Sequence, residues 1–192
     1  MARPKEFERD AVLQKAMEVF WSRGYEATSI GDLVEHLGIG RQSLYDTFGD
    51  KHDLYLAALD RYRDEVHGNV LELLRAPLPI RRVLRSFFEA SIAASIEHPD
   101  RSCMMVSAAA ERCPTDRDVK RRFCMTSADL EAAFAERLEK ARQDGEIGAR
   151  QDPQALAKFF VNTLYGLQLS AKGRGDRRTL EQVADVALST LG

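Results

Sequence analysis

Apolar residues recur at helical spacing along most of the chain, and no run of residues alternates as a strand would. In the first fifty residues this spacing predicts a helix that ends at Gly24, a second helix over residues 30–37 and a third over residues 41–48. Beyond residue 50, prolines, glycines and aspartates separate the longer periodic stretches. The pattern therefore predicts an all-α protein of about nine helices, three of which form an N-terminal domain over residues 1–50.

The second and third predicted helices are short, and a tight turn separates them. Gly38 in this turn is expected to adopt the left-handed backbone conformation that other residues resist. Ser29 and Asp32 have the spacing of a capping box, and Asp50 is expected to cap a long helix that begins near Lys51. Two short helices joined in this way are the minimum helix-turn-helix, whose second helix can lie in the major groove of DNA.

The third predicted helix has an apolar side and a polar side. Leu44 and Phe48 on the apolar side are expected to pack against the preceding helix. Arg41 and Gln42 on the polar side can each form two hydrogen bonds with a base, guanine and adenine respectively. The other side chains expected to contact DNA, through its phosphates, are Ser43, Tyr45, Thr47, Lys51 and, at a helix N-terminus, Thr28 or Ser29.

Charge in this region leaves two interpretations open. Asp46 on the polar side either repels a phosphate or acts as a local cap or ion-pair partner. Residues 1–51 hold seven Lys and Arg against nine Asp and Glu, so DNA binding requires the positive side chains to gather on one face. Arg3 and Lys5, expected in an N-terminal arm, can add phosphate or minor-groove contacts.

The run Gly38-Ile39-Gly40-Arg41-Gln42-Ser43-Leu44-Tyr45-Asp46-Thr47-Phe48-Gly49-Asp50-Lys51-His52-Asp53-Leu54, with Gly24-Tyr25-Glu26-Ala27-Thr28-Ser29-Ile30 before it, closely resembles the DNA-binding segment of the TetR family of transcriptional regulators. The resemblance is strong over about residues 8–56, and beyond these residues it extends only to the expected arrangement of helices. It implies a helix-turn-helix domain at residues 1–50 and a helical effector-binding and dimerisation domain at residues 51–192. The implied function is a one-component repressor, released from a palindromic double-stranded DNA operator by a small molecule or by thiol modification.

The resemblance also implies a ligand pocket between the helices that follow residue 51. Apolar and aromatic residues with a few hydroxyl groups would suit a small, mostly hydrophobic effector. Ordinary core packing is the alternative for any single residue of this set. The residues expected to line the pocket are Phe87, Phe88, Ser91, Met104, Met105, Ser107, Phe123 and Tyr165.

The segment from Cys103 to Cys113 resembles the corresponding segment of TetR members that sense reactive electrophiles, and Lys172 lies where some of those relatives carry a lysine. Cys103 is expected near a helix N-terminus, which would lower the pKa of its thiol. If Cys103 and Cys113 share one helix they lie about 15 Å apart along it, so a disulfide within the chain is not expected. The alternative is that these two and Cys124 are buried small hydrophobic residues.

The last two predicted helices are too apolar for one chain to cover. Pairing them with the same helices of a second copy would form a four-helix bundle, and a homodimer would present two recognition helices to a palindrome. The residues expected at this dimer interface are Phe159, Phe160, Leu164, Leu167, Val183, Ala187 and Leu188.

Composition limits the other classes of function. A hydrophobic content of 44% is enough for a buried core, and the chain has neither an apolar leader nor a long apolar run, so a soluble cytoplasmic protein without a membrane partner is expected. The four histidines are scattered without a His-Glu-x-x-His pair, and no glycine-rich phosphate loop occurs. An enzyme, a metal site and a cofactor are therefore not expected. A protein-binding helical adaptor and a transcriptional activator remain alternatives.

Overall fold

The computed structural model describes the backbone of residues 3–192 and the side chains of these residues except residues 3–8, His67 and Arg174. Nine α-helices and one short 3-10 helix occur in this range, and no strand does. They are α1 (Arg3–Arg23), α2 (Ile30–Leu37), α3 (Arg41–Phe48), α4 (Lys51–Leu74), α5 (Ile80–Glu97), η1 (Pro99–Arg101), α6 (Met104–Arg112), α7 (Arg117–Gln143), α8 (Pro153–Arg174) and α9 (Arg177–Ser189). The predicted all-α fold of about nine helices is confirmed.

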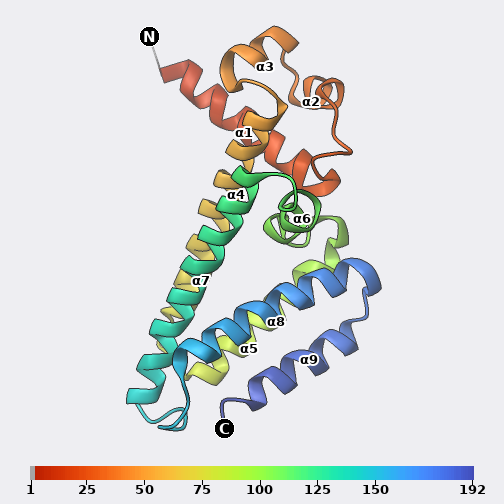
Figure 1. Ribbon diagram of the computed structural model, residues 1–192. Coiled ribbons are helices and arrows are strands. Elements are labelled where there is room, and N and C mark those ends of the chain that lie inside the picture. The colour runs from red at the N-terminus through yellow and green to blue at the C-terminus, as the bar shows by residue number, and fades with distance from the viewer. Residues whose placement is uncertain (1–2) are drawn as a thin grey trace.

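The helices form a small group at one end of the molecule and a larger group at the other (Figure 1). Helices α1, α2 and α3 make up the small group, and the first half of α4 packs against α1. Helices α4 and α7 run side by side toward the other end, where α8 packs on α7, α5 and α9. Helix α6 contacts α4, α7 and α8, so it lies between the two groups.

Local signals in the sequence set the ends of α2 and α3. The Ser29 hydroxyl accepts a hydrogen bond from the Asp32 N–H (3.1 Å), and the Asp32 carboxylate accepts one from the Ser29 N–H (2.8 Å), which completes the predicted capping box. Gly38 ends α2 with φ of 68°, the expected left-handed conformation. Asp50 caps α4, as predicted.

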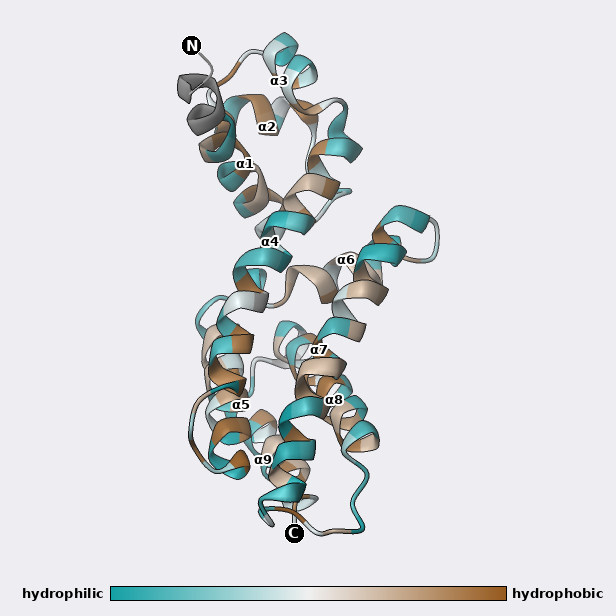
Figure 2. Ribbon diagram, turned by 90° about the vertical axis from the view of Figure 1, so that its left-hand side faces the viewer, coloured by the Kyte–Doolittle hydropathy of each residue, from teal (hydrophilic) through white to brown (hydrophobic). Residues whose placement is uncertain are grey.

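Two clusters of buried apolar side chains stabilise the fold. One joins α1, α2 and α3 to the first half of α4 and to α6, and it includes Phe20, Leu44, Tyr55 and Met104. The other fills the space between α5, α7, α8 and α9. Figure 2 shows hydrophilic residues on the outer turns of α3, on the side away from the first cluster. Arg3 and Lys5, expected in an N-terminal arm, instead begin α1, and their side chains lie outside the described part of the chain.

We expect Gly49→Ala to lower the free energy of unfolding by about 2 kcal/mol. Gly49 has φ of 81°, where a side chain is strained, and an added Cβ would collide with the Asp53 carboxylate that completes the cap of α4. Gly68→Ala is the control: Gly68 lies in α4 with nothing within 4 Å of an added Cβ, so it should stabilise the chain by up to about 1 kcal/mol. Urea unfolding followed by circular dichroism at fixed protein concentration measures both, and equal stability of Gly49→Ala and the parent would contradict the expectation.

Candidate DNA-binding interface and ligand cavity

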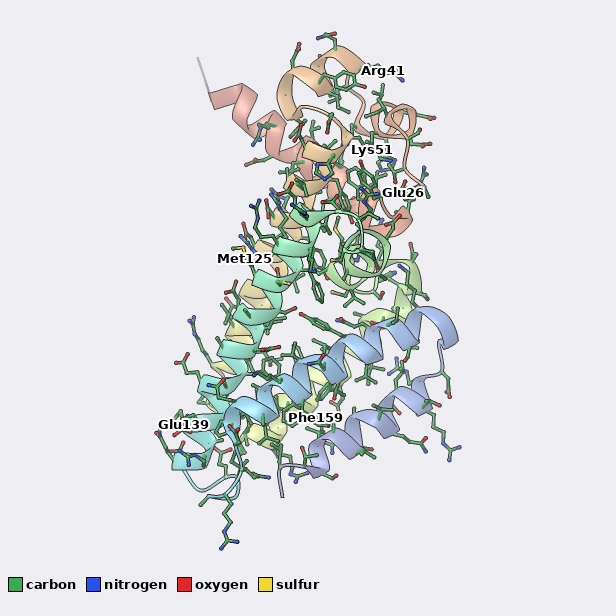
Figure 3. All side chains as sticks on the ribbon, in the orientation of Figure 1. Glu26, Arg41, Lys51, Met125, Glu139 and Phe159 are labelled. Atoms are coloured by element: carbon green, nitrogen blue, oxygen red, sulfur yellow. The ribbon has the colours of Figure 1, made fainter. Side chains whose placement is uncertain are left out.

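Helix α3 turns its polar side toward solvent. Leu44 is fully buried and Phe48 is 8% exposed, whereas Arg41, Gln42 and Tyr45 are exposed. Ser43 is also exposed and Thr47 is partly buried. Figure 3 places Arg41 and Lys51 in the end of the molecule that holds α3, far from Phe159 on α8. Four of the five predicted DNA-contacting side chains of α3 are therefore exposed, and the fifth, Thr47, is partly buried.

Asp46 has a partner within α3. The Gln42 amide Nε2 donates a hydrogen bond to Asp46 Oδ1 over 2.9 Å, and both residues are exposed. This supports the interpretation of Asp46 as a local partner. It also orients the Gln42 amide, which must share or break this bond to reach a base.

Three of the expected phosphate contacts have other roles here. Thr28 is fully buried and its hydroxyl donates to the Gly24 carbonyl over 2.7 Å, so the expectation that Thr28 reaches DNA is wrong in this conformation. Ser29 remains exposed while capping α2. The Lys51 ammonium lies 4.1 Å from the centre of the Tyr25 ring, a cation–π contact that holds it beside the turn between α1 and α2.

The C-terminal end of α6 holds the turn between α1 and α2. The Glu111 carboxylate accepts hydrogen bonds from the backbone N–H groups of Tyr25 (3.0 Å) and Glu26 (2.8 Å). The Arg112 guanidinium lies 4.6 Å from the centre of the Tyr25 ring and pairs with Glu26. These contacts connect the end of α6 directly to the turn that precedes the helix-turn-helix.

Asp116, which caps α7, joins three elements. It is 6% exposed, and it accepts hydrogen bonds from the Val119 N–H (3.1 Å), from the His52 ring at the start of α4 (2.8 Å) and from Arg112 (3.3 Å). Burial alone would raise the pKa of this carboxyl, but the hydrogen bonds from Val119 and His52 outweigh burial and lower it below its usual range. Asp116 is therefore ionised at neutral pH and binds the starts of α4 and α7 together.

A cavity of about 530 Å³ lies between α4, α5, α6, α7 and α8, with Trp21 of α1 in its wall; we call it the central cavity. Four residues of the predicted pocket line it, namely Phe87, Ser91, Met105 and Tyr165, and so does Cys103. A second hollow of about 620 Å³, between the α4–α5 connection and the end of α7, contains none of the predicted residues. Its wall carries several charged side chains of α7, which suits a small apolar ligand less well.

The other four residues of the predicted pocket do not line the central cavity. Phe88 packs into the core against Phe160, and Met104 belongs to the buried cluster shared with α1 and α4. The Ser107 hydroxyl accepts a hydrogen bond from Lys172 (2.9 Å), and the Phe123 ring packs against the Tyr165 ring, with ring centres 5.5 Å apart, and against the cluster that joins α1, α4 and α6. Residues that neighbour each other in sequence face different sides of a helix, and the expectation did not fix which side faces the cavity.

Several lining residues were not predicted. Trp21 comes from α1, so no pattern within the later helices could indicate it, and Tyr62 belongs to α4. Thr126 and Gln168 also line the cavity, and in each a buried oxygen has no hydrogen-bond partner among the described residues: Thr126 Oγ1 and Gln168 Oε1. A polar atom within an apolar periodic helix is the signal that could have indicated these two.

The pKa of the Cys103 thiol is raised, whereas the sequence predicted that it would be lowered. Cys103 is the N-cap of α6 and is 7% exposed. Burial raises the pKa of its thiol and outweighs the N–H groups of Val106 and Met105, which act in the opposite direction, so the expected lowering by the helix N-terminus is wrong. Burial also raises the pKa of Cys113, which follows α6 at its other end. Cys124 is exposed on α7.

Only two of the seven residues expected at the dimer interface are exposed. Phe159 and Val183 are 41% and 44% exposed on α8 and α9. The others face the chain's own core and cannot contact a partner in this conformation; they are Phe160, Leu164, Leu167, Ala187 and Leu188. Val186 (68% exposed) and Leu169 (55%), which were not among the residues expected at the interface, are also exposed on these two helices. Thus four of the seven exposed large hydrophobic residues in the described part of the chain lie on α8 and α9.

The chain belongs to the TetR family of bacterial regulatory proteins. Residues 12–58 match the family described as "Bacterial regulatory proteins, tetR family", and residues 79–187 match the tetracyclin repressor-like C-terminal domain. The chain is a transcriptional regulator of the helix-turn-helix type and not an enzyme, as the motif predicted. None of the described helices is long and apolar enough to cross a membrane.

Similar proteins cover nearly the whole chain. The HTH-type regulator YezE of Bacillus subtilis is 40% identical over 194 residues, spanning 100% of both chains. The HTH-type repressor ComR of Escherichia coli is 33% identical over 97% of this chain and 90% of its own. A cysteine mutant of the TetR family regulator CifR, solved with a 26-bp double-stranded operator, is 32% identical, covers 95% of this chain and 96% of its own, and has a TM-score of 0.84. The reduced form of E. coli NemR has a TM-score of 0.87 at 19% identity over 96% of this chain and 97% of its own, which shows a shared fold.

Proposed function

We propose that this chain is a one-component repressor that acts in the cytoplasm as a homodimer, binds a palindromic operator through α3, and leaves it when the central cavity is occupied or Cys103 is modified. The observation that carries the proposal is the exposed polar side of α3, with Arg41, Gln42 and Tyr45 outward and Leu44 buried, in a chain of the TetR family. The similar regulator CifR was solved on operator DNA, which supports the same partner here.

The central cavity and the helix-turn-helix domain share two helices. Helix α6 lines the cavity with Cys103 and Met105 at its start, and at its end Glu111 and Arg112 hold the turn at Tyr25. Helix α4 lines the cavity through residues 62–73 and begins directly after α3. An effector that prefers the DNA-incompetent arrangement by about 3 kcal/mol would weaken operator binding more than 100-fold.

Footprinting of the purified protein on the DNA upstream of its own gene tests this function. A two-fold symmetric protected region is expected, and the affinity should fall steeply as salt rises, because phosphate contacts release counterions. A reporter gene under the same DNA, with and without the protein, distinguishes a repressor from an activator. Absent or salt-insensitive binding would contradict the proposal.

The proposal that thiol modification releases the protein from DNA rests on the position of Cys103 in the cavity wall. With Cys113→Ser and Cys124→Ser as background, N-ethylmaleimide is expected to release the protein from DNA through Cys103. The raised pKa leaves little thiolate at pH 7, so the rate of alkylation should rise about tenfold from pH 7 to pH 8. Gel-shift assays on alkylated samples measure release. If Cys103→Ser in the same background is released equally, thiol modification plays no part.

A further inference from the structure

We infer that the central cavity binds an uncharged, largely apolar molecule that carries a hydrogen-bond donor, and that Thr126 and Gln168 recognise this donor. The inference rests on the proposed function, because it names the class of effector for the same cavity. It depends on two polar oxygen atoms that the fold buries in the cavity wall without partners among the described residues.

Thr126 is the first of these residues. It lies in the middle of α7, its side chain is 4% exposed, and its hydroxyl oxygen has no hydrogen-bond partner in the described part of the chain. Buried polar groups in native proteins nearly always have a partner, so an unpaired hydroxyl in a residue that lines a cavity suits a polar group of a ligand bound there. A threonine hydroxyl can accept as well as donate, so it fits a ligand hydroxyl or N–H.

Gln168 on α8 sets the polarity of the ligand group. Its amide Nε2 faces the Ser91 hydroxyl of α5 at 3.4 Å, which leaves Oε1 buried and without a partner. A carbonyl oxygen only accepts hydrogen bonds, so the complementary group must be a donor. The same oxygen would repel a carboxylate placed against it.

The rest of the wall favours a neutral molecule. Apolar side chains such as Val66, Phe87 and Leu130 make up most of the lining, and no Asp or Glu is among the residues that line it, so a cationic ligand would lack a counter-charge. Arg63 already donates to Asp64 at 2.9 Å and 3.1 Å, and Arg101 is exposed in η1. A volume of about 530 Å³ fits a ligand of two or more rings.

The structure also supplies a reporter for binding. Trp21 is the single tryptophan of the chain and lines the central cavity, where its indole N–H donates to the Ser102 carbonyl over 3.0 Å. Its fluorescence therefore responds to a molecule in the cavity without any label or DNA. Binding and release from DNA can then be measured separately.

Three probes of similar shape test the inference on the purified protein: 4-phenylphenol, 4-methoxybiphenyl and biphenyl-4-carboxylate. They are titrated at pH 7 by Trp21 fluorescence and by calorimetry. We expect 4-phenylphenol, the only donor, to bind at least tenfold more tightly than the other two. Thr126→Val and Gln168→Leu, each close in shape to the parent residue, should reduce this preference to threefold or less. Gln143→Leu, an exposed glutamine on α7 outside the cavity, should leave it unchanged.

The outcomes separate this inference from the proposed function. Equal affinity for all three probes, tightest binding of the carboxylate, or no binding by any probe would overturn the inference, and gel-shift assays on the operator would still test the repressor. Preserved donor preference without release from DNA would overturn the ligand-controlled release and leave the inference standing. Melting temperatures of Thr126→Val and Gln168→Leu at or above that of the parent would show that a lost preference does not reflect unfolding.

Discussion

Arg41→Ala should weaken specific operator binding by about 30-fold to about 20,000-fold. Arg41 is exposed at the start of α3, where an arginine can form two hydrogen bonds with guanine, and such a contact contributes about 1–3 kcal/mol. A dimer loses two of them, one at each half-site, and each 1.4 kcal/mol corresponds to a factor of ten. Fluorescence anisotropy with a labelled operator at constant salt measures the change.

Arg150→Ala is the matched control for this measurement. Arg150 is exposed in the connection between α7 and α8, and its removal changes the net charge by the same amount at a site far from α3. It should change operator affinity less than threefold, because exposed charges at such a distance are screened by salt. If Arg41→Ala behaves like Arg150→Ala, α3 does not read the bases through this residue.

Replacing Phe159 and Val186 together by glutamate should convert the dimer to a monomer and reduce operator affinity at least about 30-fold. Both side chains are exposed on the outer surface of α8 and α9, so the change should not disturb the chain's own core. In a two-fold interface each glutamate would be buried in an apolar contact without a partner charge. A monomer contacts only one half-site. The affinity for a specific operator exceeds the affinity for non-specific DNA by about 1,000-fold or more, and losing half of the corresponding free energy lowers operator affinity by about 30-fold.

Sedimentation at micromolar concentration measures the oligomeric state, and circular dichroism confirms that the helices remain. Met125→Glu is the control, since Met125 is 50% exposed on α7, on the other side of the molecule from α9 (Figure 3). This variant should stay dimeric and bind the operator as the parent does. If the double variant of Phe159 and Val186 remains dimeric, the dimer interface does not include these two side chains.

Features that depend on a few neighbouring residues could be predicted from the sequence. The capping box at Ser29, the left-handed turn at Gly38 and the cap at Asp50 each involve groups no more than four residues apart, so tertiary packing does not alter them. The polar side of α3 was predictable for the same reason, because Leu44 and Phe48 lie one turn apart and fix the buried side.

Features that depend on packing between distant segments could not be predicted. Thr28 was expected to bind a phosphate at a helix N-terminus, but it is fully buried and its hydroxyl donates a hydrogen bond to the Gly24 carbonyl. Helix α8 is apolar on both sides, so periodicity alone did not show that Phe160 faces inward and Phe159 outward. Trp21 reaches the central cavity from α1, and burial outweighs the helix N-terminus at Cys103.

Helix α6, with the cavity at its first turn and the Tyr25 turn at its last, has a consequence for the cell. Coupling between two binding sites is reciprocal, so under the proposed release the operator lowers the affinity of the cavity for its effector by the same factor as the effector lowers the affinity for DNA. Regulator molecules that are not bound to an operator would then capture the signal molecule first. The ratio of regulator copies to operators would set the concentration at which transcription begins.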